Sequence, residues 1–458
     1  FSEHHRTAAS YERLGRGRVQ VARNIPETDL PAVDDWTPDP IGSRSWRLFY
    51  HSLAWLLGYA WAIENGIDPE ANLAHIRERV FSHIAHNVES GPGDPLAWDD
   101  HATADRLAML VWLHCTLLAP ELGREERDRL IAAIDAHLER ITGFRDDGRW
   151  ISSNHGAFHA LAALDVGLAL PDHPVGRRGR VLGESYLRDV VNALVDGEEG
   201  VAVEQSTAYH TIDISLLRSI RPVVEDNDLD LGVDLADLCA RMVEFNHVIR
   251  GLGDRRPSIG DTPFDDAVPA IGLAATDGEP ETPRTRWIRT AGAEGEPVDD
   301  LVLYPRTGLA VLRRGEPPGG GTVTRAVVSL HGKRILHGHF DQLSVTFQVD
   351  EHRALVDSGG PYAYGDPLRF GYFVAARAHN VVMIDGLDHQ GASVLLGSGH
   401  SGTVSWVIGS HDGHPGLDVT RAVIVVDDDT LVVVDQVVDP GSDRHSFTSL
   451  WHLHPSAT

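Results

Sequence analysis

The chain has few cysteines, no long apolar run and no excess of basic residues. Cys115 and Cys239 are its only two cysteines. They are too few for a disulfide framework, so cysteine indicates no compartment. No run of 18 apolar residues occurs, so the sequence predicts no membrane span. Lys and Arg total 40 against 67 Asp and Glu, a net charge of −27. This balance speaks against a nucleic-acid-binding protein, which would need a basic surface.

The same negative charge bears on an acidic polymer as a partner. At long range the chain would repel such a polymer, so local Arg and His side chains would have to hold it at short range. Hydrophobic content of 42% and charged content of 23% over 458 residues are ordinary for a globular protein of two or three domains.

Helical patterns precede strand patterns along the chain. Residues 1–45 are polar and contain prolines, which predicts an N-terminal arm. From Trp46 to about residue 290, apolar runs of helical type end at Pro and Gly, beginning with WRLFYHSLAWLLGYAWAI. Repeated helices with short connections predict a ring or solenoid. Residues 255–300 are rich in Pro, Gly, Asp and Thr and predict a boundary, although RRPSIGDTP is expected to be ordered near a cleft.

Short strand-like pieces fill residues 300–458. AVIVV-DDDT-LVVVD is typical of a β-hairpin, and the whole region predicts an antiparallel β-sandwich. Helices followed by strands predict a multidomain, α then β, chain and exclude an alternating α/β fold. The last residues, SLWHLHPSAT, follow directly on a strand-like segment, which suggests that more sheet once followed. The first residue is Phe1, so either a leader has been removed or the sequence is a fragment.

One stretch carries a candidate metal site. His337 and His339 flank Gly338, Asp357 follows at the end of the next strand-like piece, and His379 comes 22 residues later. Two imidazoles and one carboxylate form a common ligand set for zinc. Because the chain has 26 histidines, a chance HxH pair is the alternative. The zinc would be catalytic if a coordination position stayed open, and structural otherwise.

Two further stretches carry candidate polar groups in the helical region. Asn154 and His155 precede the helix AFHALAAL, where a helix N-terminus favours an anion. The alternative is that Ser153 or Asn154 is an N-cap. Tyr209 begins a later helix, where packing is its usual role.

These stretches resemble the heparinase II/III-like polysaccharide lyases. The resemblance rests on HGHxDxLS, VDSGG, AxAHNVVMIDG, the NHG before a helix and the segment ExxxxYH. It implies an N-terminal (α/α) toroid at residues 46–290 followed by an antiparallel β-sandwich at 300–458. The implied activity is β-elimination at a uronic acid residue of an acidic polysaccharide. A secreted or periplasmic location is also implied, and the oligomeric state stays open.

The resemblance also implies roles for individual residues. The implied catalytic residues are Asn154, His155, Tyr209 and His337. The implied ligands of one structural zinc ion are His339, Asp357 and His379. The segment around Trp98 to Arg106 also resembles the family, and the implied substrate-binding residues are Trp98, His101, Arg106, Glu204, Tyr364 and Arg369. Helix capping is the alternative for Asp99 and Thr103, and support of the fold is the alternative for Glu204.

One position departs from the family pattern. Some heparinase-type members carry an acid three residues after the NHG-type histidine, where this chain has Phe158. Their substrate choice therefore does not transfer, and the absence of a clear Arg or Lys cluster favours an unsulfated polymer.

Two alternatives to the lyase stay open. One is a zinc-dependent hydrolase of a glycan, and the other is a non-catalytic glycan-binding protein. A metal-free glycosidase is disfavoured, because nothing brings Asp99, Asp100 and Glu204 together as a carboxylate pair.

Overall fold

The structure is a computed structural model that describes residues 3–91, 93–316, 321–360 and 366–456. The chain forms two compact units, Phe1–Val191 and Asn192–Thr458. This division follows packing rather than secondary-structure class. The predicted domain boundaries at residues 46 and 300 therefore stay predictions.

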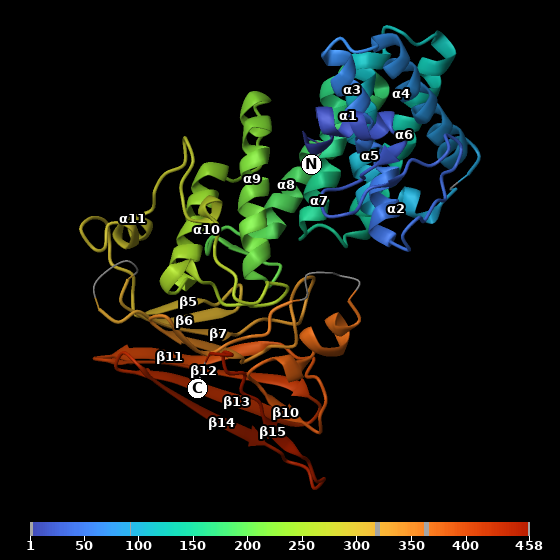
Figure 1. The fold of residues 1–458 in the computed structure, drawn as a ribbon. Coiled ribbons are helices and arrows are strands. Elements are labelled where there is room, and N and C mark those ends of the chain that lie inside the picture. The colour runs from blue at the N-terminus through green and yellow to red at the C-terminus, as the bar shows by residue number, and fades with distance from the viewer. Residues whose placement is uncertain (1–2, 92, 317–320, 361–365, 457–458) are drawn as a thin grey trace. The chain divides into compact units, whose positions relative to one another are not determined.

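The first unit is helical (Figure 1). A short hairpin, β1 (Arg18–Val19) with β2 (Thr28–Asp29), lies near its start. Its helices are α1 (Ala8–Gly15), α2 (Arg44–His51), α3 (Leu57–Glu64), α4 (Pro69–Ile84), α5 (Asp100–Leu113), α6 (Arg124–Asp147), α7 (Asn154–Ala169) and the greater part of α8 (Pro174–Leu194). Residues 1–45, predicted as an arm, contribute the buried side chains Leu14, Val19, Val21 and Trp36 to this unit.

The single helix predicted from Trp46 onward is wrong. α2 ends at His51, Leu53 adopts a left-handed φ of 62°, and the chain restarts through a 3-10 turn into α3. An aromatic stack explains the break, because the rings of Tyr50 and Trp55 lie parallel with centroids 5.7 Å apart. The Trp55 indole also donates a hydrogen bond of 3.0 Å to the Tyr50 carbonyl, which a continuous helix would not allow.

The second unit places three helices before its sheets, namely α9 (Thr207–Asp226), α10 (Leu235–Ile249) and α11 (Pro283–Arg289). A two-stranded ribbon, β3 (Val195–Asp196) with β4 (Val201–Ala202), precedes α9. α11 lies within the segment 255–300 that the sequence marked as a boundary. No helix among the described residues is long and apolar enough to cross a membrane.

Two antiparallel sheets form the sandwich. The five-stranded sheet has the order β5 (Leu301–Tyr304), β6 (Leu309–Arg314), β7 (Thr324–Ser329), β8 (Val345–Val349) and β9 (His352–Leu355). The four-stranded sheet has the order β11 (Ser393–Ser401), β12 (Val404–His414), β13 (Leu417–Val426) and β14 (Thr430–Val438). A separate pair joins β10 (Val382–Ile384) to β15 (Phe447–Ser449). The predicted β13–β14 hairpin is confirmed, with Val426 opposite Thr430.

The burial of each strand follows from its place in the sandwich. β6 and β7 are buried at every residue, because one face packs on the second sheet and the other on α10 through Phe245 and Val248. β13 alternates buried and partly exposed residues, since only one of its faces meets the core. Figure 1 shows β5–β7 facing β11–β14.

The core face of β13 can be tested by a matched pair of substitutions. Val423 is fully buried between the sheets, whereas Val434 on the neighbouring strand is 53% exposed. We expect Val423→Ala to lower the free energy of unfolding by about 2 to 3 kcal/mol, because it leaves a cavity. Val434→Ala should change it by less than about 0.5 kcal/mol. Equal losses in urea unfolding would contradict the assigned register.

Candidate functional site

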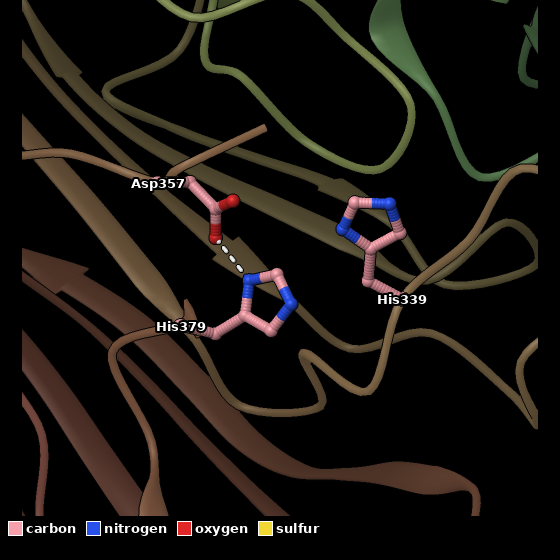
Figure 2. Close-up of side chains that lie close together, drawn as sticks. All are labelled: His339, Asp357 and His379. Carbon is pink, nitrogen blue, oxygen red and sulfur yellow. Dashed lines mark hydrogen bonds and ion pairs between the residues drawn. The ribbon is translucent and has the colours of Figure 1, made fainter. Parts of the chain in front are cut away.

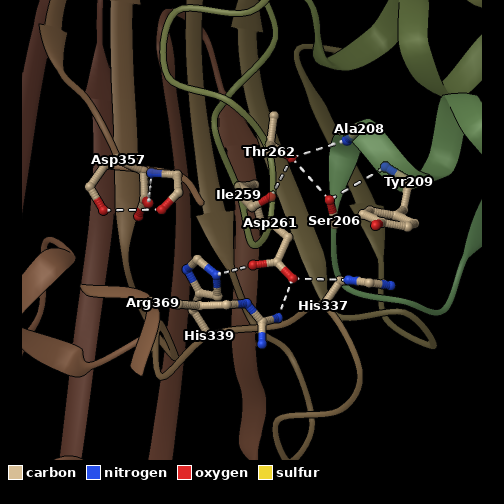
Figure 3. A network of polar contacts seen from close by, with 12 residues as sticks. Ser206, Ala208, Tyr209, Ile259, Asp261, Thr262, His337, His339, Asp357 and Arg369 are labelled. Carbon is tan, nitrogen blue, oxygen red and sulfur yellow. Dashed lines mark hydrogen bonds and ion pairs between the residues drawn. The ribbon is translucent and has the colours of Figure 1, made fainter. Parts of the chain in front are cut away.

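The candidate site of the second unit begins at the N-terminus of α9. Ser206 caps the helix and accepts a hydrogen bond from the Tyr209 amide, and the Thr262 hydroxyl accepts one of 3.0 Å from the Ala208 amide. Thr207 donates a bond of 2.7 Å to the Pro257 carbonyl. These contacts fix the loop 257–262 against the turn that carries Tyr209 (Figure 3).

Asp261, on that loop, is the centre of the site. Its carboxylate accepts hydrogen bonds from His337 Nδ1 at 2.9 Å, from His339 Nε2 at 3.2 Å and from Arg369 Nη2 at 2.5 Å. Burial alone would raise the pKa of Asp261, but these three donors lower it below its usual value. A carboxylate can only accept, so His337 carries a proton on Nδ1 and His339 carries one on Nε2.

Tyr209 and His337 form a close pair beside Asp261. Their rings are stacked, with centroids 3.4 Å apart and an angle of 12° (Figure 3). Glu204 Oε1 lies 4.0 Å from His337 Nε2. Glu204 is fully buried, and burial followed by the Glu204 charge raises the pKa of the adjacent Asp213 well above its usual value. This burial favours the supporting alternative for Glu204 over the predicted contact with substrate.

Two glycines allow the loops to meet at this point. Gly260 has a φ of +60°, and a Cβ there would lie 2.2 Å from the Gln205 carbonyl and 2.6 Å from that of His337. Gly359 has a φ of +65°, and a Cβ there would lie 2.0 Å from the Thr262 carbonyl. Only glycine fits such positions without displacing the backbone.

His339, Asp357 and His379 come together as a candidate metal site. One potential ligand atom from each lies within 4.8 Å of the others, and all three side chains are buried (Figure 2). Asp357 stands at the end of β9, where its Oδ1 accepts a bond of 3.0 Å from the Gly359 amide. Asn380 holds the His379 segment by donating to the Val345 and Val356 carbonyls at 2.8 and 3.0 Å.

The hydrogen bonds of His339 and His379 each use one ring nitrogen and leave the other available for a metal ion. His379 Nδ1 donates to Asp357 Oδ2 at 2.7 Å, so its Nε2 keeps a lone pair. Among the described residues, His379 Nε2 and His339 Nδ1 are buried without a hydrogen-bond partner. Such buried atoms are costly unless something binds them. The donor set therefore fits a divalent metal ion.

The first unit carries its own polar cluster at the start of α7. Asn154 and His155 occupy the first turn, as predicted, and Ser153 is the N-cap. His155 Nδ1 donates to Asp100 Oδ2 at 2.5 Å, and the His155 ring stacks on Trp150 with centroids 4.7 Å apart. Burial would raise the pKa of Asp100, but hydrogen bonds from His155 and His159 lower it well below the usual value. Within the described residues, Asn154 Oδ1 is buried and has no hydrogen-bond partner.

The predicted substrate-binding residues of this unit differ in exposure. Trp98 is partly exposed and lines a surface hollow of about 520 Å³ with Arg140. His101 lies against His155, with ring centroids 3.9 Å apart. Arg106 is fully buried and donates to His137 Nε2 at 2.7 Å and to the carbonyls of His51 and Ala97 at 2.9 and 2.5 Å. This burial assigns Arg106 to the interior of the helical unit rather than to substrate.

Two predicted residues remain to be placed, and two residues of the site were missed by the sequence predictions. Arg369 is mostly buried and is bound to Asp261, and Tyr364 lies outside the described residues. Asp261 and Asp100, which orient His337 and His155, were not predicted as site residues. The only sequence signal for Asp261 was the segment RRPSIGDTP, expected to be ordered near a cleft. The sequence points to Asp100 only as a member of the segment 98–106 and as one of three carboxylates for a glycosidase pair.

Comparisons with known proteins bear on the family and on the fold. Residues 296–458 match the family model described as heparinase II/III-like, C-terminal. No curated protein matches the chain. A crystal structure of a mutant of the heparan sulfate lyase HepC from Pedobacter heparinus has a TM-score of 0.66 at 16% identity, covering 97% of this chain and 70% of that one. A crystal structure of heparinase III has a TM-score of 0.67 at 18% identity, covering 95% and 71%.

Residues 296–458 of this chain therefore match the C-terminal domain of the heparinase II/III-like family. At 16 to 18% identity the solved structures show the fold alone. That fold is a helical toroid followed by an antiparallel β-sandwich, which confirms the predicted fold class.

Removal of individual side chains tests the metal site. We expect His379→Ala to abolish binding of a divalent cation. Asp261→Asn should weaken binding about 10- to 100-fold, because Asp261 orients His339 without touching the metal. Metal content after dialysis, and titration with Zn²⁺ in a calorimeter, would measure both effects.

His352→Ala is the matched control, because His352 is an exposed histidine on β9. It should bind as the wild type does. Full metal occupancy in His379→Ala would contradict the assigned ligand set.

Proposed function

We propose that this protein is a polysaccharide lyase that cleaves a uronic-acid-containing polysaccharide by β-elimination. The observation that carries the proposal is the stacked pair of Tyr209 and His337, with Asp261 behind His337. The pair stands where the heparinase II/III-like domain adjoins the start of α9. Metal-independent hydrolysis is less well supported, because the described residues near this pair offer no two accessible carboxylates on opposite sides of a scissile bond.

The reaction makes two demands on the protein. The proton on C5 of the uronic acid must be removed, and the negative charge that develops on the carboxylate must be stabilised. The electron pair of the C5–H bond forms the C4=C5 double bond, the C4–O bond breaks, and the leaving oxygen takes a proton. The chemical step therefore needs a group that accepts a proton, a group that donates one and a group that stabilises the charge on the carboxylate.

Tyr209 is the proposed acid and base. An ordinary tyrosine has a pKa of about 10, so its phenolate needs a nearby donor or cation. His337 is stacked on the Tyr209 ring with its Nδ1 bound to Asp261, and a proton on its Nε2 would make it that cation. With Nδ1 fixed, His337 presents Nε2 for a proton or for the substrate carboxylate.

Asn154 and His155 are the proposed carboxylate-binding groups. The Asn154 carboxamide lies in the first turn of α7, where free backbone N–H groups and the helix dipole favour an anion. Asp100 fixes the Nδ1 proton of His155, which leaves Nε2 as the group that meets substrate. A neutral hydrogen-bond donor and a histidine at this place would stabilise the enolate-like state.

The proposed cofactor is one zinc ion held by His339, Asp357 and His379. Zinc bound there would connect the loop of His339 to the ends of β9 and the His379 segment. The three ligands are at most 2% exposed, which leaves little room for substrate and supports a structural role. The residues of this chain then carry out the chemistry, and the metal maintains the position of His337 two residues before His339.

An ultraviolet assay tests the proposal. Elimination creates a C4=C5 double bond conjugated with the carboxylate, and this group absorbs ultraviolet light. Hydrolysis creates no such double bond. We expect absorbance to rise with at least one polymer from a panel of uronate polysaccharides. Tyr209→Phe should lower kcat at least about 100-fold, because it removes the proton-transfer group.

Tyr11→Phe, on α1 of the first unit, is the matched control and should keep full activity. Chain shortening without absorbance would replace the lyase by a zinc-dependent hydrolase. Binding of a polymer without any product would replace it by a glycan-binding protein.

A further inference from the structure

Two glutamine side chains hold the loop that precedes His337, since Gln342 Nε2 donates a hydrogen bond of 3.0 Å to the Gly332 carbonyl and Gln205 makes two more. Gln205, with a left-handed φ of 57°, accepts a hydrogen bond of 3.1 Å from the Ile335 amide and donates one of 3.1 Å to the Lys333 carbonyl. A Cβ on Gly338 would lie 2.0 Å from Gln205 Oε1, so the loop approaches as closely as glycine allows. Lys333 and Arg334 therefore extend from a fixed backbone four and three residues before His337, and the charges of Arg369 and Asp261 act on Arg334.

Arg334 has no acidic partner there. Among the described residues its guanidinium makes no ion pair, and its Nε is buried without a hydrogen-bond partner. It lies over the Phe340 ring at 5.7 Å from the centroid. Burial lowers the pKa of Arg334, and the charge of Arg369 lowers it further, against the opposing effect of Asp261. A partly desolvated cation in this situation gains from a bound anion.

Asp261 cannot serve as that anion. Its carboxylate already accepts from His337, His339 and Arg369. Arg334 therefore lies near Arg369 and Asp261 while Asp261 is already bound by other donors, and Lys333 directly precedes it in the chain. These neighbouring cations stand in a chain whose net charge is −27.

Lys333 is the only lysine of the chain. Of the 40 basic residues, one is lysine and 39 are arginine. Its side chain is exposed, and its carbonyl is the one that Gln205 holds. The exposed ammonium of Lys333 and the neighbouring guanidinium of Arg334 can therefore bind one anion from two sides.

We propose that Lys333 and Arg334 form an oxyanion-binding subsite for a second acidic group of the polymer. The subsite binds a carboxylate or sulfate on a sugar next to the one that reacts. Arg334 would donate two parallel hydrogen bonds to this anion, and Lys333 would contribute a compact positive charge. The inference rests on the proposed lyase function and adds to it a specificity for polymers with neighbouring acidic sugars. It also explains how a strongly acidic protein holds an acidic chain at short range.

Kinetics with two kinds of polymer test the subsite. Arg334→Gln and Lys333→Gln should each raise KM about 10- to 100-fold on a polymer of contiguous uronates, since each removes a charged hydrogen bond made in ground state and transition state alike. kcat should stay within about twofold. On a polymer whose uronates alternate with neutral sugars, KM should hardly change. A larger effect on a sulfated polymer than on an unsulfated one would assign sulfate as the anion, and the reverse would assign carboxylate.

Arg444→Gln is the control for loss of an exposed arginine elsewhere on the second unit, and it should leave KM unchanged. Lys333→Arg and Arg334→Lys should recover part of the loss, because they retain the charge. An unchanged KM in both Gln variants on every active polymer would overturn the subsite while the lyase stands.

Chemical labelling of the single lysine tests the same subsite without catalysis. In Tyr209→Phe, acetylation of Lys333 by an activated ester can be followed by mass spectrometry of its peptide, separately from the terminal amine. A saturating uronate oligosaccharide should slow this reaction at least about tenfold, and a neutral oligosaccharide of equal length should not. Protection with no product from the wild type on any polymer would retain the subsite and remove the lyase. Equal rates with and without the uronate oligosaccharide would overturn the subsite.

Discussion

The second unit depends on a single buried carboxylate. Asp261 carries a charge in a place from which water is largely excluded, and such a charge is tolerated only when donors surround it. Its three donors come from two separate segments, the loop with His337 and His339 and the turn with Arg369. Loss of any one donor would leave the charge undercompensated. The compensation therefore fixes several loops at once, and this explains how irregular backbone can hold the candidate site without a regular element beneath it.

Positive side chains lie close to the candidate site although the chain as a whole is acidic. Arg369 binds Asp261, and Arg334 lies near both of them. Screening reduces the repulsion of an acidic polymer beyond about 8 to 10 Å at physiological salt. Contacts at hydrogen-bond distance are screened much less, so a few cations beside the site outweigh the distant acids. Strong attraction at long range is therefore not a requirement for an enzyme that binds a polyanion, provided that the cations at the site lack acidic partners of their own.

The sequence predicts what is local and periodic. The 3.6-residue pattern located α5 to α10, and the alternation around DDDT located the β13–β14 hairpin. The candidate ligand set His339, Asp357 and His379 was predictable from the HxH pair, from an acid at the end of a strand-like piece and from the resemblance to the family. Asp261 was not predictable as a site residue, because its partners are 76 to 108 residues away and its own segment is a loop. The break at Leu53 depends on the stack of Tyr50 on Trp55, and the burial of Arg106 depends on carbonyls from other elements, so neither has a local pattern.

The same contacts explain how a structural metal can influence chemistry at a distance. His339 faces the candidate metal site with Nδ1 and donates a hydrogen bond to Asp261 from Nε2. Asp261 also accepts a hydrogen bond from His337, and the His337 ring stacks on Tyr209. Each link fixes an orientation or a tautomer, and none transfers charge to the substrate. A metal in this position would act by reducing the number of arrangements that His337 can adopt, which lowers the entropy lost when substrate binds. A metal that polarised substrate directly would instead need an open position, and ligands this deeply buried provide none to a polymer.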